Sequence, residues 1–399
     1  MREILRGPIR TLPLQKWCGG LMTCVMTFFL VAGCAAVQQV NPDSLETELD
    51  ILVPKLLDEQ SVPGVSIAIV QGGTIIIAKG YGFSNKNKGT PVKPETHFQI
   101  GSVSKTLTAW GVMKLVERGL VELDAPVDGY LKRWHLPKTE FDNKKVTVRR
   151  VLSHTGGLSV SGYHGVFVDG DKLPTIPESL DGYSGSDGGL KVIQEPGTGF
   201  RYSSGGYTLL QLLIEDVIDE PFASYMQRTI FEPLGMKNSS YQWRPNSQVP
   251  SAIPYSITGV AYPHYQIIEQ GSGGVFNTTG SDLALFVAAS ASSAEGKPAG
   301  RGLLKPETVR QMLAPADQTD GSYGLGYKMF PVSKEVQLIT HDGANEGFRA
   351  MYLLHPQKGD VIVILTNSDA GGKIMAPIIC EWSERVAIDM SPLCKSVSR

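Results

Sequence analysis

Ser102 and Lys105 are the two residues of the chain whose types and spacing best suit chemistry. They form the only S-x-x-K sequence among the 399 residues, at a point where a loop leads into a predicted helix. Residues three apart on a helix share a face, so the hydroxyl and the amine can meet there. A lysine can take the proton of a serine only where burial or positive neighbours keep its amine neutral. The pair predicts a serine nucleophile with a lysine base, and the alternative is an N-capping serine beside a surface lysine.

A tyrosine and a histidine further along the chain extend this candidate site. Tyr202 and Ser204 stand at alternate positions of a glycine-rich turn that leads into a helix, where the phenol can pass a proton to a leaving group. His341 and Gly343 follow a predicted strand at 336–340. There the histidine can orient a substrate or pair with its charge, and the glycine leaves room for a substrate backbone.

Three other polar residues near these motifs have ordinary explanations. A lone histidine is usually satisfied by a structural hydrogen bond, and we expect this of His154. Asp342 is expected to be a turn residue rather than a catalytic acid, and Ser104 to pack near the site rather than attack a substrate. The chain contains no G-x-S-x-G sequence, which argues against an α/β-hydrolase, and no P-loop or H-E-x-x-H sequence.

The elements that must position these residues are strands at both ends of the chain with helices between them. Apolar residues at helical spacing predict helices over 44–58, 102–119, 207–217 and 373–388. β-Rich runs predict strands over 64–70, 74–80, 323–330, 336–340, 349–355 and 361–366. The middle of the chain, about 120–310, is expected to be mostly helical and rich in loops. This order predicts one sheet closed by both ends of the chain, with a large helical insertion.

The first 33 residues have the pattern of a secretory signal. Basic residues precede an apolar run from Gly19 to Ala32 that is short for a transmembrane helix. Small residues directly before Cys34 resemble a bacterial lipoprotein processing site, which predicts acylation of Cys34 and a tether over 34–43. The expected location is the cell envelope, and Ala35 after the cysteine favours the periplasmic face of the outer membrane. The alternatives are a plain signal peptide with an incidental cysteine, or a retained membrane anchor.

Composition and cysteine usage narrow the function classes. With 42% hydrophobic and 19% charged residues, the chain has the composition of a globular protein. The formal net charge of −2, without a basic run interleaved with aromatic residues, argues against a nucleic-acid partner. The sequence has no C-x-x-C and no close group of His and Cys, so a metal site has little support. Cys380 and Cys394 are equally compatible with a disulfide and with two free thiols.

Taken in order, these motifs resemble those of the serine β-lactamase and penicillin-binding-protein superfamily. Its three motifs are matched by Ser102/Lys105, Tyr202/Ser204 and His341/Gly343. Further stretches are similar to the class C-like branch, at 147–158, 230–236, 273–275, 282–284 and 323–327. The resemblance covers about 45–390 and implies an α/β fold: an antiparallel β-sheet flanked by terminal helices, with an inserted mostly helical domain. One hydrolase domain over 44–399 is expected, with sheet parts at about 44–95 and 315–390 and the insert at about 96–314.

The resemblance also implies a mechanism. Ser102 would attack a carbonyl and form an acyl-enzyme, while Lys105 and Tyr202 share the general base and acid work. The backbone N–H groups of Ser102 and Ala344 would form the oxyanion hole, and no metal or organic cofactor is implied. The expected partners are small-molecule, peptide or ester substrates, peptidoglycan fragments among them.

Two departures from the family pattern bear on the substrate. Ser204 stands where the β-lactamases of this branch carry asparagine, and His341 stands where they carry lysine. The histidine is more similar to the D,D-peptidases, D-aminopeptidases and esterases of the family. We therefore expect hydrolysis of an ester, amide or D-amino-acid peptide bond. The alternatives are a β-lactamase or penicillin-binding D,D-carboxypeptidase, and a non-catalytic envelope lipoprotein that binds peptidoglycan fragments.

Overall fold

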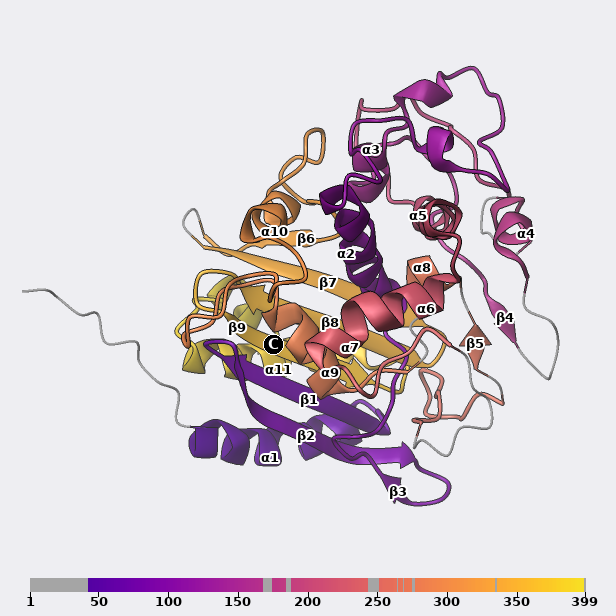
Figure 1. Cartoon of the computed structure of the whole chain (residues 1–399). Coiled ribbons are helices and arrows are strands. Elements are labelled where there is room, and N and C mark those ends of the chain that lie inside the picture. Colours follow the sequence, from indigo (N-terminus) through magenta and orange to yellow (C-terminus); the bar gives the residue numbers. More distant parts are fainter. Residues whose placement is uncertain are drawn as a thin grey trace, which may run out of the picture. The chain divides into compact units, whose positions relative to one another are not determined.

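One seven-stranded antiparallel sheet organises the fold (Figure 1). The computed structural model describes residues 42–397, except 168–173, 184–187, 243–250, 264, 268, 275–276 and 334–335. The strands lie in the order β3-β2-β1-β9-β8-β7-β6, and each neighbouring pair is antiparallel. Their bounds are Gly64–Gln71 (β1), Thr74–Asn85 (β2), Thr90–Pro91 (β3), Lys328–Pro331 (β6), Gln337–Asn345 (β7), Phe348–His355 (β8) and Asp360–Thr366 (β9). Because β1 pairs with β9, the predicted sheet closed by both ends of the chain is confirmed.

The interior strand β1 supplies side chains to two separate cores. Successive side chains of a strand point to opposite faces of the sheet. Val65, Ile67 and Ile69 therefore pack with the terminal helices, whereas Ala68 and Val70 pack with the helical region. A strand buried on both faces needs a nearly continuous apolar run, which the β1 sequence has.

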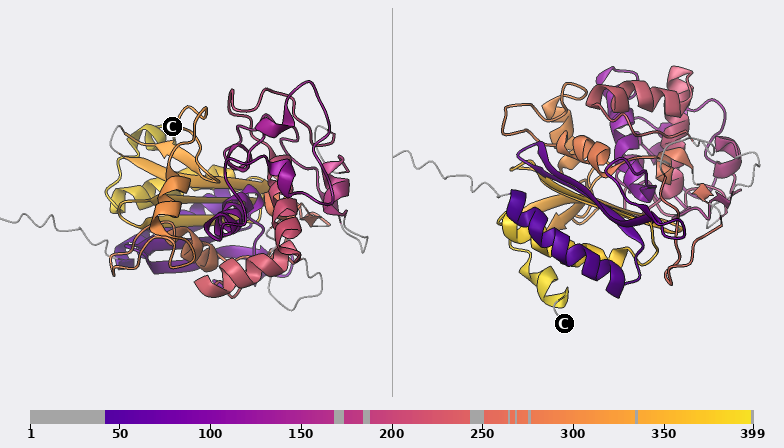
Figure 2. Two further views of the ribbon diagram at one scale, coloured as in Figure 1. Left: turned by 45° about the horizontal axis from the view of Figure 1, so that its top comes forward. Right: turned by 90° about the horizontal axis from the view of Figure 1, so that it is seen from below.

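The two ends of the described chain cover one face of the sheet (Figure 2). Helix α1 (Pro42–Glu59) buries Leu45, Leu49 and Val53, which recur every four residues along one stripe. It packs beside α11 (Gly372–Arg385), and the short helix α12 (Ser391–Val397) follows. A disulfide joins Cys380 to Cys394, so of the two alternatives for these cysteines the structure has the bonded pair.

The helical region covers the opposite face, as expected (Figure 2). Its centre is α2 (Ser104–Glu117), which is buried around nearly its whole circumference and packs against α5 and α8. The larger helices after α2 are α3 (Val148–Leu152), α4 (Ile176–Leu180), α5 (Ser204–Ile218), α6 (Phe222–Met226), α9 (Gly280–Ala288) and α10 (Pro306–Leu313). The short elements are η1 (Gly101–Val103), η2 (Val127–Tyr130), η3 (Asn143–Lys145), the π-helical turn η4 (Gln227–Phe231), α7 (Glu232–Leu234), α8 (Gln270–Gly273), and the two-stranded ribbon of β4 (Val166–Phe167) and β5 (Gln266–Ile267).

Three predicted strand boundaries were wrong. The strand expected to end at 80 continues to Asn85. The strand expected over 323–330 begins only at Lys328, because Gly326 adopts a φ of +86° and turns the chain before the ladder starts. The strand expected to end at 340 continues to Asn345, so Asp342 is a strand residue and not a turn residue. Burial alternates from His341 to Asn345, which is the pattern of a strand with one covered face.

The predicted anchor falls outside the described residues, since Cys34 and the tether up to 41 precede them. Within 42–397, less the gaps given above, no helix has both the length and the apolar character needed to span a membrane.

Candidate active site

Ser102 lies in the turn η1, which is pressed against the strand β7. Gly101 has a φ of +50°, and a Cβ atom there would lie 2.6 Å from the backbone nitrogen of Ala344. A Cβ atom on Gly343 would lie 1.9 Å from the carbonyl oxygen of Ile100. Both glycines are therefore needed for the close approach of η1 and β7. A Cβ atom on Gly343 would also lie 2.9 Å from the backbone nitrogen of Ser102, so the backbones of η1 and β7 pack directly against each other.

The free edge of β7 explains why that approach is open. Strand β6 pairs with β7 only as far as Thr340, so no strand among the described residues pairs with the stretch from His341 onward on that side. Gly343, predicted to make room for a substrate backbone, instead makes room for the chain's own Ile100. Its part in substrate binding stays a prediction.

We expect a large loss of stability and activity from Gly343→Ala. The new methyl group collides with a backbone carbonyl, so η1 and Ser102 must shift, at a cost of about 1 to 3 kcal/mol or more. Chemical denaturation measures the stability, and hydrolysis of a small ester measures the activity. Gly372→Ala is the matched control, because a Cβ atom at Gly372 meets nothing within 4 Å. Equal stability of the two variants would contradict the packing described here.

Lys105 reaches Ser102 from the first turn of α2. Its Nζ lies 3.0 Å from the Ser102 Oγ and donates a hydrogen bond of 2.5 Å to the carbonyl oxygen of Ser272. The side chain is almost completely covered, at 1% exposure. Burial, and then the charge of Lys328, lowers the pKa of Lys105 to about 7, while Asp342 acts in the opposite direction. A substantial fraction of the amine is therefore neutral at neutral pH, as a proton acceptor must be.

Tyr202 lies next to this pair, just before α5. The Lys105 Nζ lies 5.1 Å from the centre of its ring. Burial raises the pKa of Tyr202 above its usual value, against the smaller opposing effect of Ser102. Tyr202 is therefore a neutral phenol at neutral pH, suited to passing a proton on rather than to removing one first. The three predicted catalytic residues are thus brought together.

The His154 ring packs against the Tyr202 ring. The ring centres of His154 and Tyr202 lie 4.3 Å apart, and Nδ1 of His154 accepts a hydrogen bond of 3.1 Å from the backbone N–H of Ser203. The predicted structural hydrogen bond of His154 is confirmed. Burial, with a smaller contribution from the Lys105 charge, holds the pKa of His154 well below its usual value, so the imidazole is neutral.

His341 occupies a different environment from the one its motif suggested. It is fully buried at 0% exposure, with Nε2 3.1 Å from the Tyr323 hydroxyl and Nδ1 2.8 Å from the carbonyl oxygen of Asp342. A carbonyl can only accept, so Nδ1 carries the proton and Tyr323 donates to Nε2. Burial lowers the pKa of His341 to about 3. A neutral, enclosed ring argues against the charge pair with a substrate that the sequence suggested.

The Ser204 hydroxyl, expected to bind the substrate, is instead hydrogen-bonded within the protein. The Oγ donates a hydrogen bond of 3.0 Å to the carbonyl oxygen of Ser161 and thereby ties α5 to the loop beside it. The neighbouring Ser203 caps α5, because its Oγ accepts the N–H of Gly206. Binding of a substrate by Ser204 stays a prediction, and this hydrogen bond does not favour it.

Lys328 is a charged residue at the site that the sequence analysis missed. It stands opposite Thr340 in the β6–β7 ladder, forms an ion pair with Asp342, and places Nζ 5.9 Å from the centre of the Tyr202 ring. The pairing of β6 with β7 places Lys328 beside the site. The sequence shows a lysine directly after the 323–327 stretch, but the position of its side chain depends on the register of β6 against β7.

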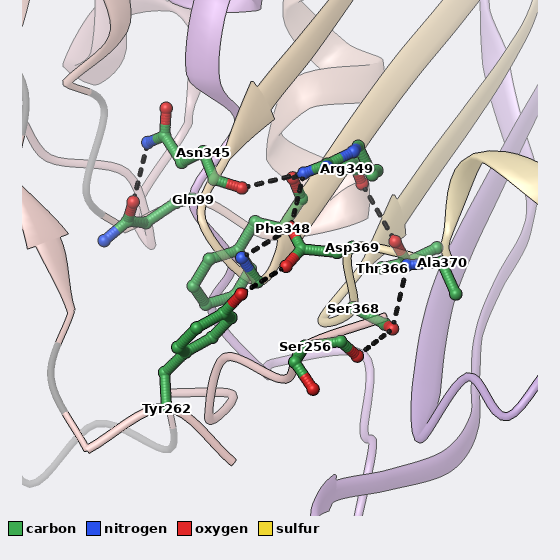
Figure 3. Close-up of polar contacts among 11 residues, drawn as sticks. Gln99, Ser256, Tyr262, Asn345, Phe348, Arg349, Thr366, Ser368, Asp369 and Ala370 are labelled. Atoms are coloured by element: carbon green, nitrogen blue, oxygen red, sulfur yellow. Dashed lines mark hydrogen bonds and ion pairs between the residues drawn. The ribbon is translucent and has the colours of Figure 1, made fainter. Parts of the chain in front are cut away.

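A polar network fixes the turn that ends β7 (Figure 3). The Asp369 carboxylate accepts hydrogen bonds from the Tyr262 hydroxyl at 2.7 Å and the Gly347 N–H at 3.0 Å, and Arg349 Nη1 lies 3.0 Å from it. The Asn345 side chain, at the end of β7, donates a hydrogen bond of 2.6 Å to Oε1 of Gln99, which shortly precedes Ser102 in the chain. The network therefore anchors the strand whose edge faces η1.

We expect graded losses of stability when this network is reduced. Tyr262→Phe removes one hydrogen bond and should cost about 1 kcal/mol. Asp369→Ala removes the shared acceptor of three groups and should cost about 3 kcal/mol. The unfolding free energy from urea titration measures both. Equal costs, or a larger cost for the tyrosine variant, would show that Asp369 is not the centre of the network.

Among the residues that the structure describes, no group of three or more His, Cys, Asp or Glu side chains is placed to hold a metal ion. The chemistry open to the described cluster is that of a hydroxyl nucleophile, an amine base and a phenol.

The sheet, the terminal helices and the helical insertion define the fold of the serine β-lactamase and penicillin-binding-protein superfamily. The Beta-lactamase family model matches residues 49–377, so the chain belongs to the Beta-lactamase family. The resemblance predicted from the motifs is thereby confirmed.

Individual relatives are distant. Protein flp of Staphylococcus aureus (strain MRSA252) is 23% identical over 328 residues, which are 81% of this chain and 63% of that protein. This chain thus spans less than two thirds of the length of that relative. Penicillin-binding protein 4* of Bacillus subtilis (strain 168) is 26% identical over 344 residues, with 80% of this chain and 71% of that protein covered. The structure of the octameric penicillin-binding protein homologue from Pyrococcus abyssi superimposes with a TM-score of 0.66 at 26% identity, covering 82% and 75% of the two chains.

Proposed function

We propose that this protein is a serine hydrolase that works through an acyl-enzyme on Ser102. The observation that carries the proposal is the buried Lys105 amine, 3.0 Å from the Ser102 Oγ and with its pKa lowered to about 7. A lysine that served only packing or a surface ion pair would not need a buried position beside a hydroxyl.

In the proposed reaction, neutral Lys105 accepts the Ser102 proton as Oγ attacks the substrate carbonyl. The negative charge that develops on the carbonyl oxygen is stabilised by the N–H groups of Ser102 and Ala344. Tyr202 then gives its proton to the leaving group and takes the one held by Lys105, as the bond between the carbonyl carbon and that group breaks. Water attacks the resulting ester, with the same groups as base and acid, and releases the carboxylic acid and free Ser102.

The proposed substrates are esters, amides or D-amino-acid peptide bonds, in preference to β-lactams. Two findings support this preference. His341 is neutral and enclosed, so it does not supply the cation that the class C-like β-lactamases carry at this position. Ser204 holds its hydroxyl against a backbone carbonyl. The name of the Bacillus subtilis relative makes penicillins a necessary probe, and a penicillin-binding D,D-peptidase is the second candidate.

The proposed location is the bacterial cell envelope, through a lipid on Cys34. The support is the sequence alone, in which a basic segment, an apolar run and small residues precede the cysteine. Mass spectrometry of the protein extracted from membranes tests it. An acylated Cys34 as the first residue is expected, and an unprocessed Met1 would refute the proposal.

The function is tested by the intact mass of a soluble form beginning after Cys34, mixed with a fluorophosphonate and separately with a penicillin. A covalent adduct of the fluorophosphonate on Ser102 is expected. A lasting penicillin adduct on the same residue would point to the D,D-peptidase, whereas consumption of the drug without an adduct would point to a β-lactamase. Failure of the fluorophosphonate to label Ser102, with no ester hydrolysis, would overturn the proposal.

We expect ester hydrolysis to fail on the acidic side of neutrality. Protonated Lys105 cannot accept a proton, so kcat/KM for a neutral ester should fall about tenfold per pH unit well below pH 7. Initial rates with p-nitrophenyl acetate between pH 5 and 9 measure the midpoint. A flat profile between pH 5 and 8 would show that Lys105 is not the base.

A further inference from the structure

An ion pair at the edge of the candidate site has no part in the mechanism proposed above. Lys328 of β6 and Asp342 of β7 form it, with 33% and 57% of their side chains exposed. Both residues lie where the pairing of β6 with β7 stops, at the first residue of β6, while β7 continues beside β8. The pair is thus fixed to two strands and remains in contact with solvent.

Lys328 and Lys105 lie against the same aromatic ring. Their Nζ atoms are 5.9 Å and 5.1 Å, respectively, from the centre of the Tyr202 ring. Two cations against one ring repel each other, and removing the proton of the buried one relieves the repulsion. The geometry therefore couples the charge of an accessible lysine to the state of the enclosed one.

The groups around the Lys105 amine show which charges act on it. Ser102 comes from η1, the Ser272 carbonyl from α8, and the rings of Tyr202 and Tyr207 from the α5 side. His154 and His341 are neutral, and the Tyr207 and Tyr323 phenols keep their protons because burial raises their pKa values. Glu269 precedes Ser272, and its charge acts on Tyr163. Lys328 and Asp342 are the charges that act on Lys105 itself.

We propose that the Lys328–Asp342 ion pair sets the protonation of Lys105, Lys328 favouring the neutral, proton-accepting amine and Asp342 opposing it. The inference rests on the proposed function, because it concerns the base of that reaction. Both residues are positioning residues in this sense: they act on the substrate only through Lys105. The two members of the pair must then have opposite effects on the same pH profile.

The shifts of the Lys105 pKa agree with this arrangement. After burial, the charge of Lys328 lowers the pKa of Lys105, and the charge of Asp342 raises it. Opposite charges at unequal distances from a third group do not cancel. Because the pair is partly exposed, salt screens its effect, and the influence on Lys105 should weaken as ionic strength rises.

The test is the pH dependence of kcat/KM for p-nitrophenyl acetate, a neutral ester whose binding does not depend on these charges. Lys328→Met should move the acidic midpoint upward by about half to one pH unit, and Asp342→Asn should move it downward by a similar amount. The double variant should move the midpoint upward by less than Lys328→Met does, because Lys328 has the larger effect on Lys105. Lys328→Arg, which keeps the charge, should restore the original profile.

A matched control removes an ion pair on the far face of the sheet. Lys79 contacts Asp50 at 2.7 Å, beside α1, so Lys79→Met and Asp50→Asn change the net charge equally without approaching Lys105. These variants should leave the midpoint unchanged. The rate of fluorophosphonate labelling at each pH gives the same midpoint without turnover, and thermal unfolding shows that each variant is folded.

The outcomes separate this inference from the function on which it rests. If the unaltered protein neither hydrolyses the ester nor reacts with the fluorophosphonate, the proposed function fails. If it does both, but the Lys328 and Asp342 variants shift the midpoint in the same direction or not at all, the electrostatic role of the pair is refuted. Opposite shifts in the single variants, with a midpoint between theirs in the double variant, would establish it.

Discussion

Ser102→Ala is expected to abolish ester hydrolysis, with kcat reduced by about 10⁴-fold or more. The alanine keeps the backbone N–H of the proposed oxyanion hole but removes the hydroxyl oxygen that lies 3.0 Å from the Lys105 amine. Steady-state hydrolysis of p-nitrophenyl acetate measures the loss. The protein should remain folded, because the change removes a single oxygen atom from a partly buried side chain.

Ser104→Ala is the matched control for the nucleophile. Ser104 is the first residue of α2 and is fully buried, so it is a neighbouring hydroxyl in a different environment. This variant should keep its activity within a few-fold. If Ser104→Ala were inactive and Ser102→Ala active, the nucleophile would be wrongly assigned.

Lys105→Met is expected to lower kcat by about 10³-fold and to remove the acidic limb of the pH profile near pH 7. Methionine has a similar length but accepts no proton. The same change should leave the thermal midpoint unchanged or raised. A pKa lowered from 10.5 to about 7 means that burying the amine costs on the order of a few kcal/mol at neutral pH, and methionine does not incur this cost.

The combination of lost activity with retained or increased stability distinguishes this prediction from simple unfolding. Lys79→Met, on the opposite face of the sheet, serves as the control and should change neither kcat nor the limb near pH 7. A Lys105→Met variant that still showed the limb near pH 7 would assign that limb to another group.

The fold was predictable where periodicity is strong. The helix expected over 44–58 is α1 at Pro42–Glu59, and the strand expected over 361–366 is β9 at Asp360–Thr366. Apolar residues every three to four positions, or in a short β-branched run, determine such elements locally. The spacing of Ser102 and Lys105 was equally informative, because a helix brings residues three apart together without help from the rest of the chain.

The electrostatics of the site were not predictable in the same way. The neutrality of His341 depends on its complete burial and on Tyr323, and the position of Lys328 depends on the β6–β7 register. Asp342 lies in a strand and not in the expected turn, because β7 continues to Asn345 with the Asp342 side chain on its exposed side. Such features arise from tertiary contacts, and no local pattern encodes them.

The contact between η1 and β7 also determines when the site can first exist during protein synthesis. A ribosome that has completed α2 has made Ser102 and Lys105, but Gly343 and Ala344 emerge only near the end of the 399-residue chain. The interior strand β1 likewise cannot complete its pairing until β9 has been made. Long-range pairings of this kind slow folding. At that stage the nascent chain carries η1 and α2 but lacks the strand edge against which η1 packs. The site therefore stays inactive until strands β7 to β9 have been made.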